Sequence, residues 1–281
     1  MTGDHVGPVD RHCENLSGMR DDAASPVLPR SPQATDGEHT PARPSRLRLL
    51  AGAAVHTYTA SGSVLGLLIV LAAFEGEVVV ALWLMLATLV IDGTDGMLSR
   101  MARVKETIPW FDGALLDNIV DYLTYCFAPV VLLWTIGALP DGPWGWALAA
   151  LPLLASSYQF CRTDAKTDDH TFLGFPSYWN VVAFYVIVLD LSRPAVAAVL
   201  VICSILVFVP VRYLYPSRTE TFWQVSMALT AVWFVTYAVL VVQYPDPNPF
   251  VVAASLAYVV YYVAISGYLT VLAAHRRRKA A

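Results

Sequence analysis

The sequence predicts an all-α protein, a polytopic bundle of helices inside a membrane. Of its 281 residues, 57% are hydrophobic and only 14% are charged, against roughly 25% charged residues in an ordinary soluble domain. So few charged side chains cannot cover the surface of a soluble protein of this size. The formal net charge of −4 gives no basic excess for binding nucleic acid, and we predict no nucleic-acid partner.

The first 45 residues differ in composition from the rest of the chain. They are rich in Pro, Ser, Asp, Arg and Thr and contain almost no aliphatic run. Such a segment cannot bury enough apolar surface to offset its chain entropy. We therefore predict a disordered cytoplasmic tail over 1–45 and a transmembrane domain over 46–281.

Eight apolar segments follow, each approaching the roughly 20 residues that a membrane-crossing helix needs. We predict spans near 51–73, 77–98, 114–138, 144–161, 176–191, 195–212, 222–243 and 250–274. The ends of the second, fourth, fifth and sixth segments are the least clearly marked. Six or seven spans are therefore the alternatives to eight.

Basic residues in the short loops predict the orientation of the bundle. They gather in the loops after the second, fourth and sixth spans and at the C-terminal end: Arg100, Arg103, Lys105, Arg162, Lys166, Arg212, Arg218 and 276–279. The opposite loops contain several acids but only Arg193 as a base. We expect the basic loops and both termini to lie in the cytoplasm.

Four acids occur where a membrane protein would normally have apolar residues. Asp92 and Asp95 are three residues apart at the cytoplasmic end of the second span, and Asp117 and Asp121 are four apart near the start of the third. On helices, each pair shares one face. The connecting loop is short, so we expect the two helices to be antiparallel neighbours and the four carboxylates to converge.

The energetics of such a cluster predict a metal site. An acid at the centre of a membrane helix costs roughly 2.5–3.5 kcal/mol, and clustered anions also repel one another. Four carboxylates suit hard divalent cations, and two such ions could act on a phosphoryl group. The alternatives are a merely interfacial position for Asp92 and Asp95, and a proton or cation relay through Asp117 and Asp121.

The residues around the acids agree with a phosphate-containing ligand. Gly96 and Gly113 each lie one turn from an acid and would allow close approach to the backbone. Arg100 continues the face of Asp92 and Gly96 and could bind a phosphate in a bidentate manner. A purely topogenic role for Arg100 is the alternative.

The spacing of these residues resembles the signature of the CDP-alcohol phosphotransferases. These integral membrane enzymes transfer a phosphatidyl or related group from a CDP-linked donor to an alcohol. Eight positions match within 30 residues: Asp92, Asp95, Gly96, Ser99, Arg100, Gly113, Asp117 and Asp121. Ser99 stands where the family usually has Ala.

Within this family the chain is most similar to the bacterial phosphatidylcholine synthases. Twelve residues separate Arg100 from Gly113, more than in most members. The segments LLDNIVDYLTY, SSYQFCRTDAKTDDHTFLGFPSYWNVVAFY and YPSRT also resemble those enzymes. The resemblance therefore extends from about Val55 to beyond Arg218.

The resemblance implies a fold, a reaction and a location. The family core has six transmembrane helices, so about two C-terminal helices are additional, and members are commonly homodimers. The implied reaction condenses choline with CDP-diacylglycerol and releases CMP, in the bacterial inner (cytoplasmic) membrane. Membrane lipids are the other expected partners.

The resemblance also assigns roles to single residues. Asp92, Asp95, Asp117 and Asp121 are the expected ligands of Mn²⁺ or Mg²⁺, with two ions expected, and Asp121 is the expected general base. The expected CDP-binding residues are Thr59, Asp95, Gly96, Ser99, Arg100 and Gly113. Thr59 belongs to His56-x-x-Thr59, where the family often has Asn in place of His56.

The acceptor alcohol is less clearly marked. Choline is a cation that aromatic faces attract, and the candidates for its pocket are Tyr122, Tyr125, Tyr178 and Trp179. The alternative for each is an ordinary aromatic residue at the membrane interface. Asp164, Asp168, Asp169 and His170 form an acidic loop that either attracts choline or is only solvated. Arg212 and Arg218 either contact lipid phosphates or only set the topology.

Two other functions are the alternatives. One is phosphatidylserine synthase or another CDP-alcohol phosphotransferase with a different acceptor. The other, more remote, is an ion-coupled membrane transporter. Transporters often have two repeated halves, whereas the acidic pattern occurs once in this sequence.

Overall fold

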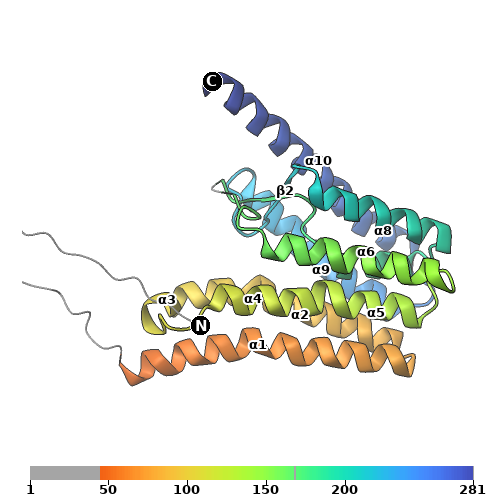
Figure 1. Ribbon diagram of the computed structural model, residues 1–281, viewed down its shortest axis with the longest axis horizontal. Helices are drawn as coiled ribbons and strands as arrows, with labels where there is room; N and C mark the ends of the chain where they lie inside the picture. Colours follow the sequence, from red (N-terminus) through yellow and green to blue (C-terminus); the bar gives the residue numbers. More distant parts are fainter. Residues whose placement is uncertain (1–44, 168, 281) are drawn as a thin grey trace, which may run out of the picture. The chain divides into compact units, whose positions relative to one another are not determined.

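The computed structural model describes residues 45–280 apart from Asp168. The predicted disordered tail therefore lies outside the described residues, except for Ser45. The described chain is almost entirely helical, which confirms the predicted all-α bundle (Figure 1). Its helical elements are α1 (Arg46–Glu75), α2 (Val78–Met101), α3 (Val104–Thr107), α4 (Gly113–Asp121), η1 (Tyr122–Phe127), α5 (Ala128–Thr135), α6 (Pro143–Cys161), α7 (Trp179–Val188), α8 (Arg193–Phe208), α9 (Trp223–Gln243) and α10 (Pro249–Ala280).

Each of the eight predicted spans coincides with a helical segment. Within residues 45–280, five helical segments are long and apolar enough to cross a membrane, namely α1, α2, the continuous run from α4 to α5, α9 and α10. Helices α7 and α8 are apolar but shorter. The chain is thus a multi-pass membrane protein, while the count of eight spans and the orientation stay predictions.

The third predicted span is not a uniform α-helix. Between α4 and α5 the chain forms the π-helical segment η1. Pro129 follows at the start of α5, and a proline clashes with the carbonyl four residues earlier in an α-helix. The wider π turn before Pro129 accommodates this proline. Segment η1 also begins directly after Asp121, and π segments are frequent at functional sites.

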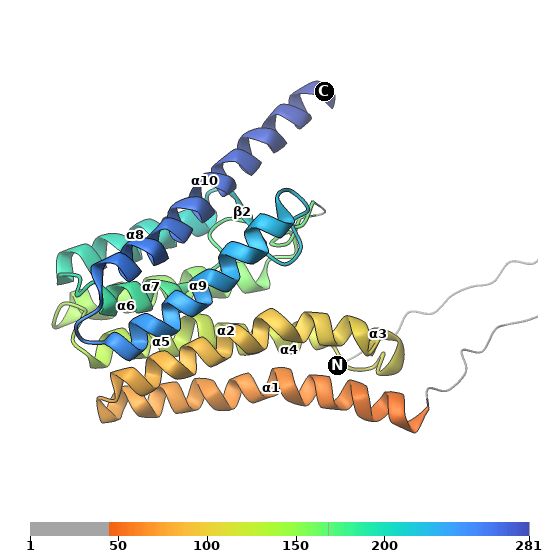
Figure 2. The same ribbon diagram turned by 180° about the vertical axis from the view of Figure 1, so that it is seen from behind.

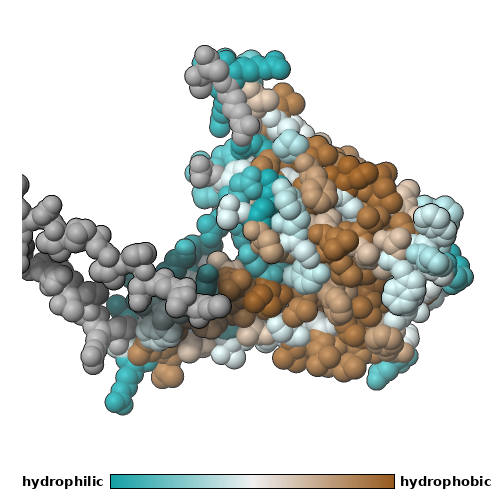
Figure 3. Space-filling view, in the orientation of Figure 1, coloured by the Kyte–Doolittle hydropathy of each residue, from teal (hydrophilic) through white to brown (hydrophobic). Residues whose placement is uncertain are grey.

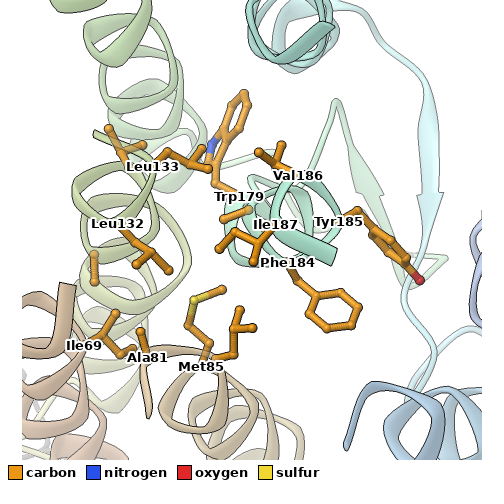
Figure 4. Close-up of a cluster of buried hydrophobic side chains, with 14 of the residues drawn as sticks. Ile69, Ala81, Met85, Leu132, Leu133, Trp179, Phe184, Tyr185, Val186 and Ile187 are labelled. Carbon is orange, nitrogen blue, oxygen red and sulfur yellow. The ribbon is translucent and has the colours of Figure 1, made fainter. Parts of the chain in front are cut away.

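Helix α7 is the centre of the hydrophobic core. Eight of its ten residues are buried, and Figure 4 shows Trp179, Phe184 and Ile187 among side chains of α1, α2 and α5. A helix that is hydrophobic on every side is stable only when protein or lipid surrounds it. At about 1.5 Å per residue, α7 is only about 15 Å long, so the predicted span at 176–191 was too long.

Helix α1 holds the acid-bearing helices together. It packs along α2 and also contacts α4, η1 and α5, whereas α2 and α4 make few direct contacts. Helices α2 and α4 are nevertheless neighbours as predicted, because their acidic side chains meet, and α1 packs against both of them. An added Cβ at Gly62 would lie 2.5 Å from Cγ1 of Val120, which shows how closely α1 approaches α4.

A small antiparallel sheet was not predicted. Strand β1 (Thr171–Leu173) lies between α6 and α7, and β2 (Arg212–Leu214) lies between α8 and α9. Phe172 pairs with Tyr213 at the centre of the register. In both views the sheet lies at the same end of the bundle as α3, the start of α1 and the end of α10 (Figures 1 and 2).

The surface agrees with a membrane environment. Figure 3 shows hydrophobic residues over the middle of the visible face and hydrophilic residues gathered toward the end that carries β2. Many large apolar side chains are exposed on the long helices, for example Leu67, Val235 and Val260. In water such a surface would be an aggregation hazard, whereas in a bilayer it contacts lipid.

Candidate active site

Three carboxylates from two helices meet at one point. Asp92 lies on α2, and Asp117 and Asp121 lie one turn apart on α4. One oxygen of each lies within 4.8 Å of the others. Carboxylate oxygens are the ligands preferred by Mg²⁺, Ca²⁺ and Mn²⁺, so the donor set fits a hard divalent cation.

Asp95 lies beside these three acids. Its side chain is buried, and its Oδ2 accepts a hydrogen bond from Oγ1 of Thr59 at 2.8 Å. Asp95 and Thr59 line the same small cavity as Asp92, Asp117 and Asp121. The four predicted acids therefore converge, but the three-carboxylate group excludes Asp95, whose role as a metal ligand stays a prediction.

Local sequence explains how α4 begins at this site. Asp112 caps α4, because its Oδ1 accepts hydrogen bonds from the backbone amides of Ala114 and Leu115, each at 3.0 Å. Gly113 follows and packs against His56, whose Cε1 would lie 2.7 Å from an added Cβ. The absence of a side chain at Gly113 thus allows α1 to approach the start of α4.

The last turns of α2 carry the remaining residues of the motif. An Nη1 atom of Arg100 lies 3.4 Å from where a Cβ on Gly96 would be, so the guanidinium folds back along the helix toward Gly96. Ser99 is half-buried and Arg100 is exposed. Within the described chain Arg100 forms no ion pair, which leaves its guanidinium available to a phosphate.

An aromatic cluster adjoins the acids. The Tyr125 hydroxyl donates a hydrogen bond of 2.6 Å to Oδ2 of Asp92. The ring of Tyr125 contacts Tyr178 edge to face with centroids 5.8 Å apart. Tyr178 contacts Phe172 and Tyr262 at 6.4 and 6.3 Å. The two predicted residues Tyr125 and Tyr178 therefore lie together beside Asp92.

The other two predicted choline residues point elsewhere. Trp179 is 1% exposed, and its indole N–H donates to Oγ of Ser156 at 2.7 Å within the core. Tyr122 packs edge to face on Phe160 and donates to the Leu153 carbonyl at 3.4 Å. Trp179 is thus a core residue, and Tyr122 faces α6.

The two predicted lipid-phosphate residues have partners within the protein. Arg212 forms an ion pair with Asp169. The guanidinium of Arg218 lies over the ring of Tyr215, 5.9 Å from its centroid. Asp168 of the predicted acidic loop lies outside the described residues.

Lys166 is a site residue that was not predicted. Its Nζ lies 3.6 Å from Oδ2 of Asp117. Burial alone would lower the pKa of Lys166, but attraction to the carboxylates, that of Asp117 first, raises it above the usual value. The ammonium is therefore charged at neutral pH. In the sequence it resembled any other cytoplasmic loop lysine, and no local pattern placed it near the acids.

Comparison with known proteins identifies relatives that match about three quarters of this chain. The chain is 43% identical over 204 residues to a phosphatidylcholine synthase of Legionella bozemanae, covering 70% of this chain and 94% of the relative. It is 38% identical over 222 residues to that of Legionella pneumophila, covering 77% and 87%. It is 38% identical over 212 residues to that of Pseudomonas aeruginosa, covering 75% and 88%. No protein-family model matches the chain.

Proposed function

We propose that this chain, which belongs to the bacterial phosphatidylcholine synthases of the CDP-alcohol phosphotransferase family, transfers the phosphatidyl group of CDP-diacylglycerol to choline and releases CMP. The observation that carries this proposal is the convergence of the motif acids beside an aromatic cluster. The acids suit a reaction at a phosphate, and the aromatic rings suit a cationic alcohol. The names of the relatives support the same reaction.

The metal ligands in this proposal are Asp92, Asp117 and Asp121, with Asp95 as the fourth acid. Their oxygens fit Mn²⁺ or Mg²⁺, and two ions would balance the charge of four carboxylates. Such ions, when bound, would neutralise charge on the phosphoryl oxygens and on the leaving nucleotide.

Asp121 is the proposed general base. Its carboxylate accepts the proton of the choline hydroxyl as that oxygen bonds to the phosphorus bearing the diacylglycerol. The bond between this phosphorus and the oxygen of CMP breaks, and CMP leaves with the electron pair. The place of Asp121 beside Asp92 and Asp117 supports this role, because the base must lie close to the reacting phosphate.

The choline pocket in this proposal is built from Tyr125 and Tyr178, with Phe172 and Tyr262 around them. Aromatic faces attract a quaternary ammonium, and the hydrogen bond from Tyr125 to Asp92 places this cluster next to the acids. We leave Trp179 out of the pocket because its ring is enclosed in the core. Tyr122 is also left out, because its ring faces α6.

The nucleoside end of the donor lies along the other side of the acids in this proposal. Thr59, which donates to Asp95, belongs to this side, as do Gly96, Ser99 and Gly113. Arg100 would bind a phosphate through its planar guanidinium. The exposed position of Arg100 and its fold toward Gly96 support this assignment.

We also propose the inner membrane as the location, with the site and both termini in the cytoplasm. The basic loops support this orientation, and the bacterial relatives support the membrane. A homodimer is proposed from the family resemblance alone.

The test uses membranes that contain the full-length protein, CDP-diacylglycerol, Mn²⁺ and one labelled alcohol at a time: choline, serine or inositol. We expect labelled phosphatidylcholine with choline only. Labelled lipid with serine only would instead establish a phosphatidylserine synthase. Uptake of label into sealed vesicles with no lipid product from any alcohol would indicate a transporter and overturn the enzyme assignment.

A further inference from the structure

Lys166 is held at the acids by a hydrogen-bonded hairpin. The Leu173 amide donates to the Ala165 carbonyl, and the Thr167 amide donates to the Thr171 carbonyl, both at 2.9 Å. Lys166 itself is paired with Phe172 as an isolated bridge. We call residues 165–167 and 169–173 the Lys166 hairpin. Its strand β1 is paired to β2. Backbone hydrogen bonds therefore fix the position of Lys166.

Side chains fix the same hairpin a second time. Asp169 accepts hydrogen bonds from the hydroxyls of Thr167 and Thr171, at 2.6 and 3.2 Å, and pairs with Arg212 of β2. The Arg212 amide donates to Oγ1 of Thr270 on α10 at 2.8 Å. The hairpin is therefore anchored to β2 and, through β2, to the last helix.

The ammonium of Lys166 is charged and still has donors to offer. Its distance of 3.6 Å from Asp117 is an ion pair but too long for a hydrogen bond. The Lys166 side chain is 53% exposed, so a ligand can reach it. In the part of the chain that the structure describes, no other Lys or Arg forms an ion pair with the four acids.

The charges of the reaction explain why a cation would be useful here. Two divalent ions would balance four carboxylates, and the diphosphate of the donor then adds negative charge, for which Arg100 is the only other cation assigned in this proposal. A lysine provides three donors on a compact positive charge that binds phosphate well. It would repel choline, so its contribution should concern the donor and not the acceptor.

We propose that Lys166 binds a phosphate oxygen of the nucleoside-diphosphate donor, and that the Asp169–Arg212 pair positions it there. This inference rests in part on the proposed function, since that function supplies the diphosphate substrate. It changes the role predicted for Arg212. Instead of contacting a lipid phosphate, Arg212 acts through Asp169 and the Lys166 hairpin.

The first test measures binding of CDP, a probe without lipid, to the purified full-length protein with Mn²⁺ by calorimetry. For Lys166→Gln we expect the Kd for CDP and the KM for CDP-diacylglycerol to rise about tenfold, as for the loss of a charged hydrogen bond, while the KM for choline changes less than about twofold. Lys166→Arg should restore most of the affinity. Lys105→Gln, an exposed lysine of α3, is the matched control and should bind CDP like the parent.

An unchanged Kd for CDP in Lys166→Gln, or a rise in the choline KM alone, would overturn the proposal. The result is separable from the choice of alcohol. If the parent protein made no phosphatidylcholine but bound CDP in a Lys166-dependent way, only the proposed function would fail.

The second test concerns positioning. In the protein that retains Lys166, Asp169→Asn should raise the Kd for CDP several-fold. In the Lys166→Gln variant the same change should raise this Kd no further, because both changes act through the same contact. Arg212→Gln, which breaks the pair from the other side, should behave in the same way. If the losses in the double variants multiplied instead, Asp169 and Arg212 would not act through Lys166.

Discussion

The two sides of the candidate site are assembled in different ways. The acids come from a stretch of 30 residues on α2 and α4, whereas the side facing them combines η1, the Lys166 hairpin, β2 and α10. The first side depends on helical spacing and on the close approach of α1. The second depends on pairing between segments about 40 residues apart. Changes on the acid side should therefore affect chemistry, and changes on the opposite side should affect which ligands bind and how well.

The largest effect is expected for Asp121→Asn. Asparagine keeps the size of the side chain but cannot accept the hydroxyl proton, so kcat should fall about 10²- to 10⁴-fold. The measurement is phosphatidylcholine formation at saturating substrates, with the thermal midpoint as a check on folding. Asp141→Asn is a suitable control, because Asp141 is almost fully exposed and pairs only with Arg193. Near-normal turnover by Asp121→Asn would show that another group is the base.

An intermediate effect is expected for Tyr178→Ala. Removing an aromatic face from a cationic ligand should raise the KM for choline about tenfold, and the KM for CDP-diacylglycerol should hardly change. Tyr178→Phe keeps the face and serves as the control. A change confined to the donor KM would show that Tyr178 contacts the nucleotide and not choline.

The smallest effects are expected for the charged residues of the loop between α6 and α7. In the Arg162–Asp164 pair the Asp164 side chain is 65% exposed, while that of Arg162 is 14% exposed. Ion pairs open to solvent add little to stability, so Asp164→Asn should change the thermal midpoint only slightly. Burial would raise the pKa of Asp169, but its hydrogen bond from Thr167 and its pairing with Arg212 lower it below the usual value.

The sign of the pH dependence follows from that lowered pKa. The stabilisation from Asp169 is fully present above the unfolded pKa of about 3.9 and is lost as the pH falls through the lower folded value. The thermal midpoint of Asp169→Asn should therefore lie below that of the parent at pH 7. This difference should shrink under strongly acidic conditions, and a difference that grew as the pH fell would contradict it.

The acid side could be predicted from the sequence because helical periodicity carries the information. Asp117 and Asp121 share a face whatever surrounds the helix, and their meeting with Asp92 needed only two neighbouring spans. The packing of α1 against both α2 and α4 could not be predicted in this way, since the contact between Gly62 and Val120 joins segments far apart in the chain.

The opposite side could not be predicted in the same way. Lys166 resembles a loop residue that sets topology, and contacts between segments far apart in the chain, such as the pairing of β1 with β2, bring its hairpin to the acids. Trp179 shows the reverse error, because an aromatic residue near a membrane boundary has the same local pattern whether it faces a ligand or the core. The π segment after Asp121 was also hidden, since it depends on how Pro129 is accommodated in a continuous helix.

The pairing of β1 with β2 has a practical consequence for mapping the topology of this protein. Strand β1 belongs to the loop between α6 and α7, and β2 belongs to the loop between α8 and α9. A tag inserted in either loop would break backbone hydrogen bonds between the strands and move Lys166 away from Asp117. The loop between α5 and α6 has exposed residues at Asp141 and Gly142 and would tolerate an insertion better. An epitope placed there should report membrane sidedness while synthesis of lipid continues.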